Sequence, residues 1–183
     1  MFHPLTGVAA VFDEPMLGHE GPMACSILSQ EFYETDPTRD FKRGYGLHSG
    51  RSTTPMTYAL GGYGVDNPIP WGAEHREIMD NVYPYLAGLT VVSEDLPEEH
   101  NCVTLDPDLT DSDGIPAPKI SYRLGDNTYK MLCHGEERAK EILLAAGAKT
   151  VLSKNDDKVW WRAGWHQMGT CRMGNDPKNS VVN

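Results

Sequence analysis

The chain closes with Gly164-Trp-His-Gln-Met-Gly-Thr-Cys-Arg-Met-Gly-Asn-Asp-Pro-Lys-Asn-Ser-Val-Val-Asn183, and the rest of the sequence is organised around this stretch. Its first eleven positions hold one histidine, one cysteine and three glycines. Glycine at this density marks backbone that turns sharply or approaches another group closely. Histidine is the side chain best suited to move a proton near neutral pH, so this stretch is where we look first for chemistry.

Taken alone, His166 has two interpretations. It is either the general base of an active site or a histidine hydrogen-bonded inside a packed turn. Because most histidines in proteins are not catalytic, the residue by itself favours the second interpretation.

The longer pattern changes that balance. The unbroken run from His166 to Gly174, with Asp176-Pro177 and Ser180-Val-Val182 after it, resembles the histidine motif of the glucose-methanol-choline (GMC) oxidoreductases. The form seen here looks closest to the bacterial dehydrogenase-like branch of that family. Further segments resemble the family's substrate domain: Glu94-Asp-Leu-Pro97, Asn101-Cys-Val-Thr-Leu-Asp-Pro107, Asp113-Gly-Ile-Pro116 and Ile120-Ser-Tyr122. Met1-Phe-His-Pro4 looks like the end of another family segment, and the resemblance is loosest through residues 15–70.

The resemblance implies an α+β fold, a mostly antiparallel sheet backed by helices. It divides the chain into a portion of the substrate-binding domain, residues 1–163, and the start of the C-terminal catalytic, FAD-contacting segment, residues 164–183. It also places His3 near the loop on the cofactor side, although a surface histidine at a chain end is an equal alternative.

The implied chemistry is the oxidation of a CH–OH group by FAD. An alcohol gives up a hydride from carbon only if its hydroxyl proton leaves as well, and a neutral imidazole with a pKa of about 6.5 can accept that proton. The resemblance assigns His166 this role, as base or as hydrogen-bond partner of the substrate oxygen, and assigns the hydride to flavin N5. The substrate would be a small alcohol or sugar. An oxidase remains open beside a dehydrogenase that passes electrons to a quinone or a cytochrome.

The phosphate-binding signature of a dinucleotide domain is missing. A Gly-x-Gly-x-x-Gly loop presents backbone N–H groups to a pyrophosphate. Gly44-Tyr-Gly46 and Gly62-Tyr-Gly64 begin this pattern, but Ser49 and Asn67 stand where the third glycine belongs. We therefore expect a fragment that lacks most of the FAD-binding Rossmann domain and the family's second catalytic residue, and that is inactive alone. The alternative is a free-standing interaction or relic domain that binds no flavin.

Composition and charge argue against several classes of binding partner. The net charge of −10 argues against a nucleic-acid surface, because phosphate contacts need Lys and Arg. No apolar run approaches the length that crosses a bilayer, so a soluble chain is expected, with cytoplasm and periplasm both open. Four separated cysteines, Cys25, Cys102, Cys133 and Cys171, predict free buried thiols. No His/Cys cluster has metal-ligand spacing, and the aspartates between residues 106 and 114 do not fit an EF-hand register.

Periodicity predicts the elements between these motifs. Strands are expected at residues 7–12, 24–33, 89–93, 101–105, 119–124 and 149–153, and residues 44–50 are a strand or a loop. A helix over residues 71–86 should end or kink at Pro84. A second helix over residues 127–146 should carry Asp126 as N-cap, Gly147 as its exit and an apolar stripe of Leu132, Ala139, Ile142, Leu143 and Ala146. Residues 51–66 are predicted to be a surface loop, with an active-site lid as the alternative.

The remaining histidines and tryptophans are weaker candidates. His48 invites a catalytic interpretation, but nothing around it has site-like spacing. His75 is predicted to be solvated, and His134 structural or exposed. Trp160, Trp161 and Trp165 either wall an apolar pocket or belong to the core.

Overall fold

The computed structural model describes residues 2–20, 27–50, 54–61, 69–152 and 166–182. Its centre is a five-stranded sheet in the order β2-β3-β4-β1-β7. The strands are β1 (Leu5–Val11), β2 (Leu28–Ser29), β3 (Tyr45–Gly50), β4 (Leu86–Ser93) and β7 (Thr150–Leu152). Each neighbouring pair in this sheet runs antiparallel. The predicted α+β class, an antiparallel sheet backed by helices, is confirmed.

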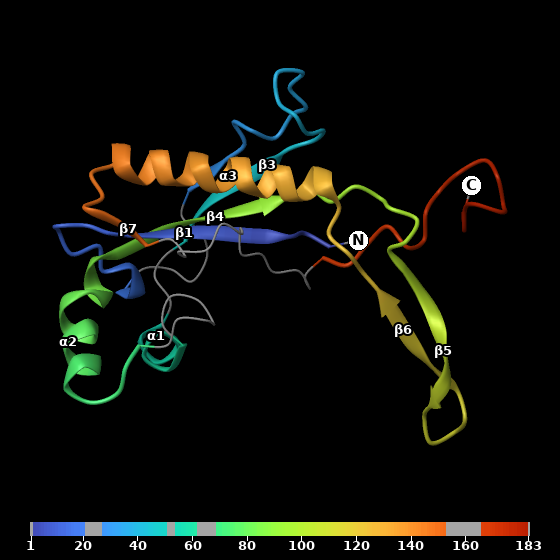
Figure 1. The fold of residues 1–183 in the computed structure, drawn as a ribbon, viewed down its shortest axis with the longest axis horizontal. Coiled ribbons are helices and arrows are strands. Elements are labelled where there is room, and N and C mark those ends of the chain that lie inside the picture. The colour runs from blue at the N-terminus through green and yellow to red at the C-terminus, as the bar shows by residue number, and fades with distance from the viewer. Residues whose placement is uncertain (1, 21–26, 51–53, 62–68, 153–165, 183) are drawn as a thin grey trace.

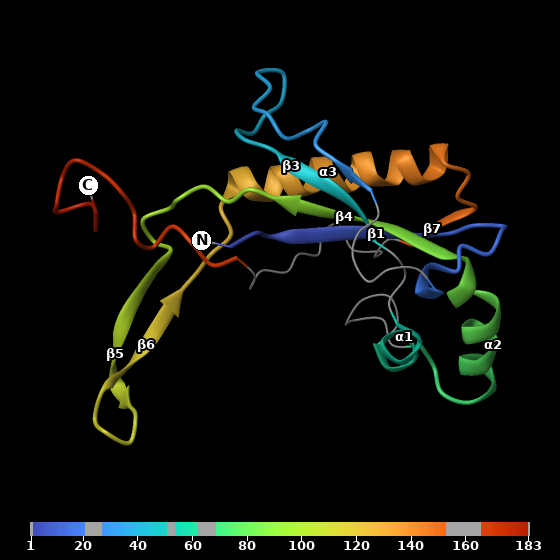
Figure 2. The ribbon, with the colours of Figure 1, turned by 180° about the vertical axis from the view of Figure 1, so that it is seen from behind.

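One long helix covers a face of this sheet. Helix α3 (Asp126–Ala145) runs across β1, β3 and β4 (Figure 1). The shorter helices α1 (Pro55–Gly61) and α2 (Ala73–Asn81) lie on the opposite side of the sheet in both views (Figure 2). Two short 3-10 turns, η1 (Gly18–Glu20) and η2 (Tyr83–Tyr85), complete this part of the chain.

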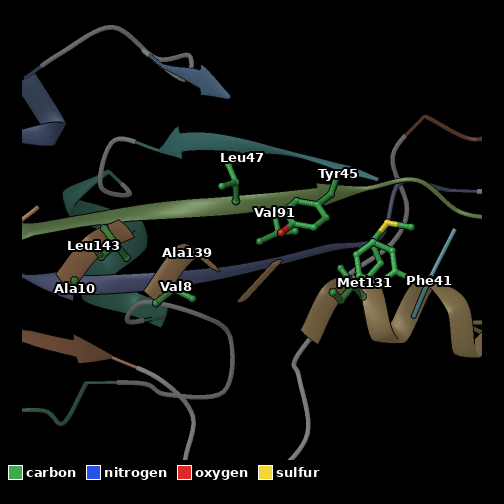
Figure 3. Packing of buried hydrophobic residues seen from close by; sticks show 10 residues of the cluster. Val8, Ala10, Phe41, Tyr45, Leu47, Val91, Met131, Ala139 and Leu143 are labelled. Carbon is green, nitrogen blue, oxygen red and sulfur yellow. The ribbon is translucent and has the colours of Figure 1, made fainter. Parts of the chain in front are cut away.

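The main core lies between α3 and the sheet (Figure 3). Its fully buried members come from each layer: Val8 and Ala10 on β1, Tyr45 and Leu47 on β3, Val91 on β4, and Met131, Leu132, Ala139 and Leu143 on α3. The helix approaches the sheet closely at Gly135, where a Cβ would lie 2.5 Å from Cγ1 of Val91. A second cluster, built on Tyr58, Tyr83 and Leu86, joins α1 to the start of β4.

A two-stranded hairpin extends away from this body (Figure 1, Figure 2). It consists of β5 (Cys102–Thr110) and β6 (Pro116–Ser121), paired antiparallel around a turn at residues 111–114. The pairing puts Val103 opposite Ile120 and Leu105 opposite Pro118, on one face. The Lys119–Asp106 ion pair belongs to the other face, so the hairpin has an apolar side that is exposed.

Most predicted elements are found, with shifted ends. Pro84 ends the predicted helix as expected, and it does so inside η2. Leu86 was expected on that helix and is instead the first residue of β4, although it still packs in the cluster that contains Ile78 and Val82. In the predicted strand 24–33, only Leu28–Ser29 pairs among the described residues, because the chain turns at residues 30–33.

Three further predictions are corrected. Residues 51–66 include a helix, α1, which Thr54 opens by accepting a hydrogen bond from the backbone N–H of Thr57. The N-cap of α3 is Gly125, and Asp126 is its first helical residue with no capping bond. The buried stripe of α3 is rotated toward Thr128, Met131 and Gly135, which leaves Ile142 42% exposed. Gly147, with φ of 96°, is the left-handed exit that was predicted.

Across the described residues, each helix is either too short or too polar to span a lipid bilayer. Within the same ranges, no three His, Cys, Asp or Glu side chains gather in a way that could hold a metal ion. Cys102, Cys133 and Cys171 are free thiols as predicted, but none of the three is buried: Cys102 and Cys133 are partly exposed and Cys171 is exposed. Cys25 lies outside the described residues.

Candidate active site

The segment that carries His166 folds back on itself. Met173 and Val182 form a parallel bridge, and the backbone N–H of Val181 donates to the carbonyl of Arg172 at 2.9 Å. The hydroxyl of Ser180 lies within hydrogen-bond distance of two carbonyl oxygens, those of Gly174 at 3.0 Å and Asp176 at 2.7 Å. Residues 172–182 are therefore a closed loop, and His166 and Gly169 lie in the segment that leads into it.

His166 sits in a backbone conformation that L-residues seldom adopt. Its φ is 55°, in the left-handed region, and its side chain is exposed. Holding a residue other than glycine there costs about 1–2 kcal/mol, so the surrounding structure must compensate. Such strain is found most often at functional positions.

The imidazole of His166 packs against a second imidazole from the other end of the chain. The ring centroids of His166 and His3 are 5.1 Å apart, and the ring planes meet at 83° in an edge-to-face arrangement. Edge-to-face contacts of this kind are favourable because the positive edge of one ring meets the negative face of the other. In both views the N-terminus lies beside the beginning of the 166–182 segment (Figure 1, Figure 2).

His3 is itself fixed to the central sheet. Its Nδ1 lies 3.1 Å from the carbonyl oxygen of Ser93, and since a carbonyl only accepts, Nδ1–H is the donor. Ser93 is fully buried at the end of β4, where its N–H and its hydroxyl both donate to the carbonyl of Pro4. The antiparallel register of β1 and β4 places these residues side by side. The ring of His3 is thus oriented by the buried end of β4.

A carboxylate ties the neighbouring elements together. Asp95 accepts from the hydroxyl of Tyr122 at 3.0 Å and from the hydroxyl of Thr128 at 2.9 Å. These bonds join the end of β4, the base of the hairpin and the first turn of α3. Phe2 packs edge-to-face on Tyr122, with ring centroids 4.7 Å apart. Burial, and after it the charge of Asp95, raise the pKa of Tyr122 well above its usual value, so this phenol stays protonated.

The phosphate cradle of a dinucleotide does not form from the described residues. Gly44 and Gly46 lie at and within β3, where Gly46 pairs with Val92, and a Cβ on Gly44 would collide with backbone carbonyls. Gly62 and Gly64 lie outside the described residues. The N-terminus of α3 has Asp126 in its first turn and the carboxylate of Glu98 beside Gly125, which disfavours an anion. Neither the glycines of residues 44–46 nor the N-terminus of α3 therefore fits the pyrophosphate of FAD.

The other histidine candidates lie in separate places. His48 is on β3, and burial lowers its pKa. His75 is on α2, stacked on the exposed ring of Trp71 with its Nδ1 facing the carbonyl of Pro70. His134 is on α3 between Phe32 and Phe41 and is hydrogen-bonded to Tyr45, so its structural interpretation is correct. Trp160, Trp161 and Trp165 lie outside the described residues.

Sequence reasoning found His166 and noted His3, but it did not pair them. Their contact depends on how the two ends of the chain meet, and no local spacing encodes that. Ser93, Asp95 and Tyr122 were missed as supporting residues for the same reason. Their positions follow from strand register and from where the hairpin leaves the sheet.

Comparisons with known proteins show which sequences this chain resembles. Residues 97–183 match the family model described as GMC oxidoreductase. The whole chain aligns with the 2-methyl-1,2-propanediol dehydrogenase of Mycolicibacterium austroafricanum at 38% identity over 185 residues, which is 33% of that protein. Shorter matches are the fructose dehydrogenase large subunit of Gluconobacter japonicus and the paromamine 6'-oxidase of Streptomyces fradiae. The first is 30% identical over 49% of this chain and 16% of the relative. The second is 32% identical over 39% of this chain and 13% of the relative.

The chain thus spans about a third of the length of the relative that it matches from end to end. The family model covers the histidine segment, the hairpin and α3, and the full-length match adds the remaining strands of the sheet. The chain is therefore similar to GMC oxidoreductases, through the family model over residues 97–183 and through the match of the whole chain to a third of one dehydrogenase.

Proposed function

We propose that this chain is the substrate-side portion of an FAD-dependent oxidoreductase that oxidises the CH–OH group of an alcohol or a sugar. The observation that carries the proposal is His166, an exposed imidazole in a left-handed turn, packed against a second imidazole that is fixed to the sheet. The names of the relatives, two dehydrogenases and an oxidase, support the reaction class.

In this proposal His166 takes the proton of the substrate hydroxyl. An exposed imidazole can reach a bound substrate, and in its neutral form it has a free lone pair for that proton. FAD, held by sequence outside the described residues, would supply the acceptor for the hydride. The substrate then loses one hydride and one proton and becomes a carbonyl compound, so atoms and electrons balance.

The same proposal includes features that rest on the family resemblance. Residues 164–183 act as the catalytic segment and residues 1–163 as part of the substrate-binding domain. A dehydrogenase of this kind passes its electrons to a quinone or a cytochrome. A free-standing interaction or relic domain without flavin is the competing hypothesis, and it predicts no dependence of any oxidation on His166.

The test replaces the proton acceptor in the FAD-loaded polypeptide that contains this chain. His166→Ala should lower kcat by about a hundredfold or more, on the scale of lost general-base catalysis. Turnover is followed with an artificial electron acceptor, with 2-methyl-1,2-propanediol and fructose as trial substrates. His75→Ala is the matched control, because His75 lies on α2 away from the His3–His166 pair, and it should leave kcat unchanged. An unaltered rate in His166→Ala would remove the proposed role of this residue.

A further inference from the structure

We propose that His3 is a positioning residue for His166: its ring, oriented by the hydrogen bond to the Ser93 carbonyl, holds the imidazole of His166 in its working direction. This inference rests on the proposed function, in which His166 handles the substrate proton. It assigns a role to a residue far from the histidine motif in sequence.

The two rings are held differently. His3 lies two residues before the start of β1 and is partly buried, and its Nδ1–H donates to a carbonyl of the central sheet. His166 is exposed and belongs to a segment whose hydrogen bonds, over residues 172–182, are made largely within that segment. The contact between the rings therefore transmits the position of the sheet to the histidine that needs a defined direction.

The hydrogen bond to Ser93 also sets the tautomer of His3. Because the Ser93 carbonyl fixes the proton of a neutral His3 on Nδ1, its Nε2 carries a lone pair. The ring orientation and the tautomer are set together, as they are for histidines whose second nitrogen bonds a backbone carbonyl. His3 therefore presents the same side of its ring to His166.

The backbone at residue 166 is strained. A left-handed φ at a residue other than glycine persists only when neighbouring contacts determine it. The ring of His3 supplies such a contact, with ring centroids at 5.1 Å. Loss of that ring should let residue 166 relax toward an ordinary conformation and carry its imidazole away from the substrate.

Two substitutions separate the ring from the hydrogen bond. His3→Asn keeps a side-chain N–H that can donate to Ser93 but removes the ring. His3→Phe keeps the ring but removes the donor. A purely structural role for the bond to Ser93 would make His3→Phe the more damaging change. The positioning role predicts the opposite order, with His3→Asn the more damaging.

The kinetic readout is made on the FAD-loaded polypeptide. His3→Asn should lower kcat by roughly tenfold to a hundredfold, since small misplacements of a catalytic group have effects of this size, and KM should change little. His3→Phe should lie between His3→Asn and the unaltered protein. His75→Asn is the control: His75 also faces a carbonyl through Nδ1 and stacks on an aromatic ring, but on α2, and it should behave as the unaltered protein.

A second readout does not depend on turnover. In nuclear magnetic resonance spectra of the chain, ring protons of His3 and His166 should show cross-relaxation, which His3→Phe preserves between residues 3 and 166. The ring signals of His166 should shift in His3→Asn and stay unchanged in His75→Asn. If His3→Asn does not fold, the positioning role of His3 is still tested by the ring contact in the unaltered chain and by the kinetics of His3→Phe.

The outcomes are distinguishable from failure of the proposed function. If His166→Ala is inactive while both His3 variants keep full kcat, the positioning role is wrong and the function stands. Absence of the ring contact in solution would equally overturn the inference. If His166→Ala keeps full activity, the proposed function is wrong, and this inference falls with it.

Discussion

His134 is a half-buried histidine, and we expect its protonation to be linked to folding. A hydrogen bond of 2.7 Å joins its Nδ1 to the hydroxyl of Tyr45, and the rings of Phe32 and Phe41 pack around it. Burial is the main cause of its lowered pKa, and the positive charges of Arg138 and Arg39 act in the same direction. Asp40 and Glu141 oppose the shift without cancelling it.

The sign of the pH dependence follows from this shift. Below its ordinary pKa, His134 binds a proton more readily in the unfolded chain than in the folded one, so folding is fully favoured above that pKa and loses stability as the pH falls through it. We expect the free energy of unfolding to decrease between about pH 7.5 and about pH 5.5. Urea unfolding curves of the chain and of His134→Phe, recorded at several pH values, measure this free energy. Its dependence on pH should be weaker in the variant.

The comparison with His134→Phe is necessary because His48 has a lowered pKa as well and contributes with the same sign. The pH dependence that remains in the variant is assigned to His48 and the other titrating groups. Equal pH dependence in the two proteins would show that His134 does not contribute.

At the scale of elements, the close approach of α3 to the sheet is made possible by one glycine. A Cβ on Gly135 would lie 2.5 Å from Cγ1 of Val91 and 3.3 Å from the ring of Tyr45. Gly135→Ala gains helix propensity of up to about 1 kcal/mol. Overpacking of a close-packed core costs about 1–3 kcal/mol, so the net effect should be destabilising.

The control for Gly135→Ala is Gly61→Ala, because Gly61 is also helical and a Cβ there meets nothing within 4 Å. This second variant should be neutral or slightly stabilised. Both are compared by thermal unfolding. A Gly135→Ala chain as stable as the original would mean that the helix can move away from β4 at no cost.

The hairpin and the main core should respond very differently to substitution. Met131 on α3 is completely buried, whereas Leu105 on β5 is 68% exposed. Met131→Ala should lower the free energy of unfolding by about 2–5 kcal/mol. Leu105→Lys should change it by less than about 0.5 kcal/mol, because the apolar face of the hairpin contacts little in this chain. Denaturant unfolding curves of the two variants test the contrast.

Local pattern predicted the elements whose burial is periodic, and it failed where tertiary contacts decide. Helix α3 was predicted because its apolar residues recur at the helical period, and β1 because it is a short apolar run closed by a turn. Leu86 satisfied a helical spacing and yet begins β4, because Pro84 had already ended the helix. Helix α1 was missed, since seven residues with one buried side chain, Tyr58, give no periodic signal.

At the scale of the whole molecule, the candidate site is assembled from both ends of the chain. His3 comes from the first residues and His166 from the last segment; their rings are in contact, and the Ser93 carbonyl at the end of β4 orients His3. The resemblance of the histidine motif could identify His166. It could not identify the partner ring or the carbonyl that orients it, because those depend on the register of β1 against β4.

The described part of the fold also bears on whether this chain can bind FAD by itself. The glycines of residues 44–46 belong to β3 and the residue before it, and the N-terminus of α3 is flanked by carboxylates, so neither place offers a cradle for a pyrophosphate. We therefore expect the 183-residue chain to leave added FAD free and to oxidise no alcohol. Flavin fluorescence on titration with the chain, and dye reduction with 2-methyl-1,2-propanediol, measure the two parts. The matched comparison is the longer polypeptide that includes the family's remaining sequence, which should quench the fluorescence and reduce the dye. Alcohol oxidation by the 183 residues with FAD alone would contradict the division of labour proposed for this fold. It would place the cofactor site within residues that the structure does not describe.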